Sequence, residues 1–171
     1  LWALEAGGRD ADETTAAVTS YLLQYQSDAD HWSHPGNRPP STGSDWTTTY
    51  VALRGLASFG TEEQEAEIES RFETVSNWLS STVPVDTEDR VFQLRALASV
   101  GAGQRALGDA THELVVRQRP DGGWAQTAYR DSDAYATGTV LTALLETGRL
   151  SRDEPVVRAG IQYLLTSQLD D

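Results

Sequence analysis

An internal repeat constrains the fold of this chain more than any other feature of its sequence. The segment 44–60 aligns without gaps with 132–148, and this alignment pairs Thr49 with Thr137 and places Gly at the end of both segments. A third copy covers residues 86–101. A unit that recurs in this way cannot bury its apolar face alone, so neighbouring copies are expected to stack.

The repeated segments have the pattern of α-helices. Leu and Ala recur at helical spacing in each copy, and the closing Gly can adopt the left-handed conformation that ends a helix. The closing glycines begin with Gly7, in the tail of a fourth copy, and follow one another at intervals of about 40 to 50 residues. Each interval has room for two helices and their loops.

A second type of helix is predicted between the repeated segments. An aromatic-Leu pair precedes both Gln26 and Gln168, with the Gln five residues after the aromatic. A weaker copy at Trp78 lacks this Gln. The chain is therefore predicted to alternate two helix types.

Start signals define the helix boundaries. Thr61 with Gln64, and Ser151 with Glu154, have the spacing of capping boxes, and no segment shows the sustained alternation of a strand. We predict an all-α fold of antiparallel helix pairs in one domain. The predicted helices cover 14–27, 46–59, 61–81, 87–100, 105–118, 133–147 and 153–168. The predicted repeat units cover approximately 1–8, 14–60, 61–101, 105–148 and 153–171.

Composition excludes several classes of partner. The 171 residues are 39% hydrophobic and 23% charged, as in globular proteins. Thirteen basic residues, all Arg, against 26 acidic ones give a net charge of −13, which argues against nucleic acid and anionic lipid as partners. No apolar run approaches the roughly 20 residues of a membrane-spanning helix. The absence of Cys excludes disulfides and thiolate metal sites.

One motif carries a resemblance to a known family. Gln118, Gly122 and Trp124 form the pattern Gln-x-x-x-Gly-x-Trp, and the helix before Gln168 resembles the first half of the same motif. The pattern resembles the repeat of squalene-hopene and other triterpene cyclases, also known as the prenyltransferase/squalene oxidase repeat. The first repeat departs from it, with Trp32 after a long insert.

The resemblance implies an αα-toroid, a ring of inner and outer helices, of which this chain is expected to be a partial segment truncated at both ends. In such a ring the motif is architectural. The Gln side chain is expected to bond the backbone at a neighbouring helix start while the Trp covers it.

The same resemblance implies a catalytic acid. Residues 86–90, Asp-Thr-Glu-Asp-Arg, are similar to the Asp-x-Asp-Asp-Thr motif of protonating cyclases, so Glu88 would protonate an alkene with Asp86 and Asp89 beside it. Two residues depart from the motif, because Glu88 replaces the catalytic Asp and Arg90 replaces Thr.

A carbocation formed in this way needs aromatic faces. Trp46, Phe92 and Tyr135 lie on or beside the inner helices and would supply them to an isoprenoid or another apolar ligand.

Helix capping offers an alternative interpretation of the acidic cluster. Asp86 would cap the helix, and Glu88 and Asp89 would complement its dipole. Asp45 and Asp133 begin the sister helices without an acidic cluster after them. Capping alone therefore explains an Asp at this position.

Metal and cofactor patterns are weak. The loops 28–44 and 119–131 are rich in Gly, Pro, Asp and Ser, as functional surfaces often are. His31 and His34 with nearby Asp residues group possible metal ligands, but they lack a zinc constellation, and 131–135 lacks the spaced oxygens of a calcium loop. No Gly-rich phosphate loop occurs. The sequence therefore predicts neither a metal site nor a cofactor.

Two hypotheses of function follow. In the first, the chain is part of the cavity wall of a cyclase, an isomerase or lyase that uses Glu88. In the second, it is a non-catalytic toroid or solenoid module whose partner is the rest of its parent chain or another protein. The altered acidic motif favours the second.

Overall fold

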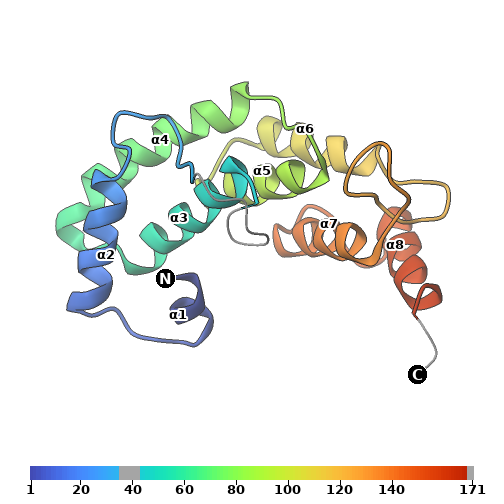
Figure 1. Ribbon diagram of the computed structural model, residues 1–171, viewed down its shortest axis with the longest axis horizontal. Helices are drawn as coiled ribbons and strands as arrows, with labels where there is room; N and C mark the ends of the chain where they lie inside the picture. The colour runs from blue at the N-terminus through green and yellow to red at the C-terminus, as the bar shows by residue number, and fades with distance from the viewer. Residues whose placement is uncertain (35–42, 169–171) are drawn as a thin grey trace. The chain divides into compact units, whose positions relative to one another are not determined.

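The computed structural model describes residues 1–34 and 43–168, and within these ranges the chain is helical and contains no strand. The all-α prediction is confirmed. The elements are the α-helices α1 (Trp2–Ala6), α2 (Glu13–Gln24), α3 (Asp45–Phe59), α4 (Glu65–Ser81), α5 (Thr87–Ser99), α6 (Gln104–Val115), α7 (Ala134–Glu146) and α8 (Pro155–Thr166), with the 3-10 turn η1 (Glu62–Gln64) before α4 (Figure 1). None of these helices is long and apolar enough to cross a membrane.

The helix boundaries follow the start signals with two corrections. The box of Thr61 and Gln64 forms, with the Gln64 side chain accepting the Thr61 backbone N–H at 3.1 Å. The box predicted at 151–154 is wrong, because α8 begins later, with Pro155 in its first turn and no side-chain cap. α6 ends at Val115, three residues before its predicted end, and the backbone N–H of Gln118 then donates to the Val115 carbonyl in a turn.

The chain divides into two compact units. The first comprises Leu1–Thr82 with Ser99–Gly101, and the second comprises Val83–Ala98 with Ala102–Asp171. In the first unit α3 packs against α1, α2 and α4. Its core side chains are almost completely buried and include Leu53, Leu56, Val75 and Leu79.

In the second unit α5 and α7 lie side by side. The Tyr135 hydroxyl near the start of α7 bonds Glu88 near the start of α5, at 3.3 Å. Towards their ends, Arg95 of α5 pairs with Glu146 of α7. The two helices therefore run in the same direction, as successive copies of a repeat do. α8 packs against α7.

The three repeated helices begin with side-chain caps. Asp86 accepts the backbone N–H of Asp89 at 2.9 Å, and Asp133 accepts that of Ala136 at 2.8 Å. In α3 the cap is Ser44, one residue before the aligned Asp45. Each cap satisfies an N–H group that the helix itself leaves without a partner.

Candidate functional site

Trp124 links the end of α6 to the start of α7. Its side chain is 0% exposed, and its indole N–H donates to the Leu114 carbonyl of α6 at 2.8 Å. Its backbone N–H donates to the Thr137 hydroxyl of α7 at 2.9 Å, and the backbone N–H of Asp133 donates to its carbonyl at 2.9 Å. The prediction that Trp124 is buried at the start of the next repeated helix is confirmed.

Gln118 brings a third helix into this arrangement. Its side-chain amide donates to the Val156 carbonyl of α8 at 2.7 Å and to the Gly122 carbonyl at 2.9 Å. The Gln is bonded to backbone, as predicted, but to carbonyl groups and to α8 rather than to the start of α7. The physical reason is that the Asp133 side chain already caps the start of α7.

Gly122 and Gly160 allow α8 to approach closely. Gly122 has a φ of +86°, and a Cβ there would lie 2.6 Å from the Ala159 carbonyl oxygen. A Cβ on Gly160 would lie 2.9 Å from the Trp124 ring. Only Gly fits the first position without strain, which explains why the motif has Gly there.

The first unit contains an equivalent arrangement around Trp32. This side chain is 1% exposed, its indole N–H donates to the Leu22 carbonyl of α2 at 3.0 Å, and its backbone N–H donates to the Thr49 hydroxyl of α3 at 3.1 Å. We call each such set of bonds a Trp tie, the first made by Leu22, Trp32 and Thr49, the second by Leu114, Trp124 and Thr137.

The sequence analysis missed the first Trp tie because it sought Gly-x-Trp. The signal that identifies it is spacing, since Gln stands six residues before Trp in both units, at Gln26 and at Gln118. The prediction of a long insert before Trp32 is therefore wrong: the additional residues lie between Trp32 and Thr49.

Arg71 of α4 supplies the third-helix contact in the first unit. Its guanidinium carbon lies 4.3 Å from the centroid of the Trp32 ring, and the group donates to the carbonyls of Gln26 at 3.2 Å, His31 at 3.3 Å and Ala29. Burial lowers the pKa of Arg71. In the second unit a side chain of the loop after α6, that of Gln118, binds the backbone of α8. In the first unit a side chain of α4, that of Arg71, binds the backbone of the loop after α2.

The acidic cluster at the start of α5 is used for capping. Asp86 accepts the backbone N–H of Asp89 at 2.9 Å, and the Asp89 side chain accepts the backbone N–H of Val85 at 2.9 Å. This reciprocal pair satisfies two N–H groups at the helix start. The capping interpretation of Asp86 is confirmed, and Asp89 has the same kind of role.

Glu88 is half-buried and faces Tyr135. The Tyr135 hydroxyl donates to the Glu88 carboxylate at 3.3 Å. Burial raises the pKa of Tyr135, and the negative charge of Glu88 adds to this effect.

The remaining aromatic candidates are core residues. Trp46 is 5% exposed and Phe92 is 4% exposed, and they belong to the first and second unit respectively. The Trp46 ring lies against Trp78 in a tilted arrangement with ring centroids 4.4 Å apart, and Trp78 stacks on His31 at 4.4 Å. Trp46 therefore packs against another aromatic ring of the first unit.

His31 also lies close to two carboxylates. Its Nδ1 is 2.6 Å from Asp30 and its Nε2 is 3.5 Å from Asp45. Within residues 1–34 and 43–168, no three His, Asp or Glu side chains form a group that could hold a metal ion. Gln168 is exposed, and Asp170 and Asp171, where the motif was expected to continue, lie outside the described residues.

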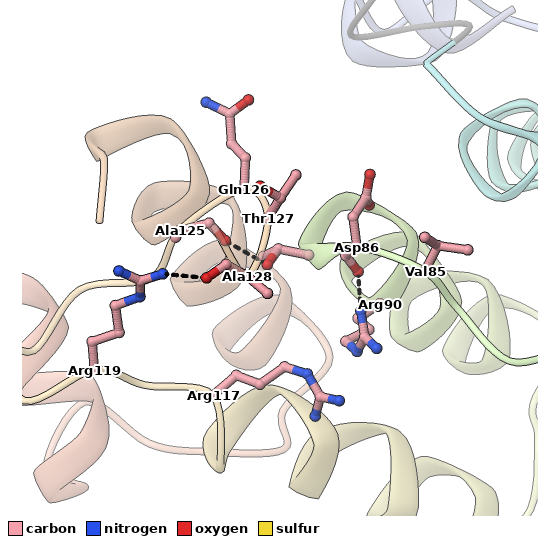
Figure 2. Close-up of a pocket in the computed structure, with 10 residues that line it drawn as sticks. Val85, Asp86, Arg90, Arg117, Arg119, Ala125, Gln126, Thr127 and Ala128 are labelled. Carbon is pink, nitrogen blue, oxygen red and sulfur yellow. Dashed lines mark hydrogen bonds between the residues drawn. The ribbon is translucent and has the colours of Figure 1, made fainter. Parts of the chain in front are cut away.

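The second unit contains a pocket of about 210 Å³ lined by arginines. Arg90 of α5 lines it together with Arg117 and Arg119 of the stretch after α6, and residues 125–128 complete the wall (Figure 2). The Thr87 hydroxyl holds this wall by donating to the Ala125 carbonyl at 2.6 Å. The sequence analysis missed the pocket because its arginines are far apart in the chain.

Comparison of the chain with models of protein families and with curated proteins finds no match.

Proposed function

We propose that this chain is a repeat segment of an αα-toroid domain of the triterpene-cyclase type, and that it acts as a scaffold rather than as the catalytic acid of a cyclase. The observation that carries the proposal is the pair of Trp ties, at Trp32 and Trp124. The first joins α2 to the repeated helix α3, and the second joins α6 to the repeated helix α7. A connection of this kind lets repeats be added in series.

The arrangement of α5 and α7 supports the same proposal. Two successive repeated helices lie side by side in one direction, with α8 packed against α7. Inner helices of a toroid have this relation to one another, and the Gln118 contact with α8 adds an outer helix. The partner of such a segment is the rest of its parent chain or another protein, and its ligand, if it has one, an isoprenoid or other apolar molecule.

The acidic cluster supports the scaffold role over catalysis. Asp86 and Asp89 are occupied in capping α5, and Glu88 accepts a hydrogen bond from Tyr135. Capping accounts for Asp86 and Asp89 without a catalytic role. Trp46 and Phe92 are 5% and 4% exposed, so their rings offer little open surface to a carbocation.

An assay with squalene tests this proposal. The purified chain, with its helical content confirmed by circular dichroism, is incubated with squalene in detergent, and extracts are analysed for cyclic products. We expect no product from the native chain or from Glu88→Gln. Cyclic product that is formed by the native chain and lost in Glu88→Gln would overturn the scaffold proposal and establish the alternative, a cyclase that uses Glu88.

A further inference from the structure

The arginine pocket of the second unit concentrates positive charge in an acidic chain. The net charge is −13, yet Arg90, Arg117 and Arg119 all line this one pocket. The fold brings them together from two segments, since Arg90 lies in the first turn of α5 and the other two follow α6. The charges of Arg90 and Arg117 act on one another, and like charges repel, while the Arg119 guanidinium lies on another part of the wall, beside the Ala128 carbonyl (Figure 2).

Arg90 is the most buried of the three and has a donor without a partner. Its side chain is 10% exposed, one terminal nitrogen donates to the Asp86 carbonyl at 2.5 Å, and its Nε has no hydrogen-bond partner among the described residues. Burial lowers the pKa of Arg90 and the nearby Arg117 charge adds to this effect, whereas the charges of Glu113, Asp86 and Asp89 oppose it. A buried guanidinium is stabilised by an anion placed beside it.

Arg117 and Arg119 have donors to spare. Arg117 bonds the Glu113 carboxylate at 2.6 Å and the Glu113 carbonyl at 2.8 Å, and Arg119 donates to the Ala128 carbonyl at 3.3 Å. A guanidinium carries five N–H donors, so each group retains unused ones.

Three carboxylates lie near Arg90, those of Asp86, Asp89 and Glu113, and the Asp89 carboxylate accepts the backbone N–H of Val85. Asp86 lines the pocket, but its carboxylate points away from Arg90 and Arg117 (Figure 2) and accepts the Asp89 backbone N–H. Glu113 binds Arg117 closely but lies 3.9 Å from Nε of Arg90, beyond hydrogen-bond distance. Glu113 is therefore the competitor that an incoming anion has to displace.

The size and the donor geometry indicate the class of ligand. A volume of about 210 Å³ is smaller than the roughly 300–1,000 Å³ of sites for larger organic ligands. A planar carboxylate is satisfied by one bidentate guanidinium. A tetrahedral oxyanion offers oxygens in several directions and so matches guanidinium groups that come from different segments.

We propose that the pocket between the start of α5, the stretch after α6 and residues 125–128 binds a phosphate group through Arg90, Arg117 and Arg119. The group is either free phosphate or the phosphate of a small monoester, since both present the same oxygens. This binding function is independent of the scaffold role proposed above.

Calorimetric titration of the chain with inorganic phosphate and with phenyl phosphate tests the proposal. Chloride is used to keep the ionic strength constant, because the net charge of the chain repels anions at low salt. We expect saturable one-site binding of at least one of the two. Tighter binding of phenyl phosphate assigns the site to a monoester, and equal binding assigns it to the free ion. Absence of saturable binding by both would overturn the proposal.

Three charge variants locate the site. Arg117→Gln and Arg119→Gln should each weaken binding by about tenfold, the loss expected for one charged hydrogen bond. Arg105→Gln makes the same change of net charge at a side chain that is 97% exposed and outside the pocket, and it should leave binding unchanged. Equal weakening in all three variants would show that only the overall charge matters and would contradict the site.

Glu113→Gln should change the affinity for phosphate in the opposite direction. Because Glu113 competes for Arg117, its neutral replacement should bind phosphate more tightly than the native chain does. Unchanged or weaker binding in Glu113→Gln would contradict the proposed position of the anion. Native circular dichroism of each variant excludes unfolding as the cause of a loss.

Discussion

The hydroxyl of Thr137 accepts the backbone N–H of Trp124 at 2.9 Å, and both side chains are completely buried. Thr49 accepts the backbone N–H of Trp32 in the same way, at 3.1 Å. A buried N–H that loses its partner is costly, so the hydroxyl is required in the repeated helices that take part in a Trp tie. Four predictions about these and other contacts follow, each with its own measurement.

Replacing either threonine by the nearly isosteric Val should destabilise the chain. Thr137→Val and Thr49→Val each remove the hydroxyl and leave the Trp N–H unsatisfied, at a cost of about 1 to 3 kcal/mol. Urea unfolding followed by circular dichroism measures the change. Thr142→Val is the matched control, because this exposed hydroxyl bonds only a carbonyl of its own helix, and its change should stay within about 0.5 kcal/mol. Equal effects at Thr137 and Thr142 would contradict the role of the buried hydroxyl.

Truncating the Trp itself should have a larger effect. Trp124→Ala should lower the free energy of unfolding by about 3 to 5 kcal/mol, as large aromatic deletions in cores do. Tyr129→Ala removes an aromatic ring that is fully exposed on the following loop, and it should change little. A loss below about 1 kcal/mol in Trp124→Ala would show that the Trp tie is not part of the stabilising core.

Adding a methyl group at two glycines should have opposite effects. Gly122→Ala should destabilise the chain by more than about 1 kcal/mol, because φ is positive there and the new Cβ would meet the Ala159 carbonyl. Gly138→Ala places a methyl group in open space within α7 and should stabilise the helix by about 0.5 to 1 kcal/mol. The difference in sign, measured by thermal and urea unfolding, is the decisive result. A stabilising Gly122→Ala would contradict the close approach of α8.

Acid should weaken the start of α2 through Asp12. A hydrogen bond from Arg9 and then one from the Thr15 backbone N–H lower the pKa of Asp12 below its usual value of 3.8. The pKa of Asp12 is lower in the folded chain than in the unfolded chain. Its contribution to the free energy of unfolding is therefore complete above the unfolded pKa and is lost as pH falls through the folded pKa.

The variant Asp12→Asn tests this pH dependence. Its unfolding midpoint should be lower than that of the native chain at pH 5, and the two should converge below about pH 3.8. Asp10→Asn is the matched control, because it makes the same change of charge two residues before Asp12. A constant difference between native and Asp12→Asn chains across this range would argue against an ionised cap.

Local pattern predicts the helices of this chain well and predicts side-chain partners less well. Helical spacing and closing glycines give the repeated helices to within a few residues, and aligning Thr49 with Thr137 pairs two residues with one role. The cap at Asp86 is also predictable, since first-turn signals act within a few residues.

Contacts between distant segments leave no such local signal. Nothing near Arg71 in the sequence indicates that its guanidinium covers Trp32, and nothing near Arg90 indicates that it meets Arg117. The motif at Gln118 predicts that a backbone group is bound, but which helix supplies it depends on the close approach that Gly160 permits. Such partners are decided by packing, which sequence spacing does not encode.

The Trp ties also have a consequence for how the chain folds. The indole of Trp124 reaches a carbonyl only ten residues back, and its backbone N–H reaches a hydroxyl thirteen residues ahead. These contacts join residues that are near one another in the chain, so the loops between them are short. A loop of ten residues closes on the order of 10–100 ns. Each Trp tie therefore joins residues that are neighbours in the chain, and its formation does not have to wait for distant parts of the polypeptide to meet.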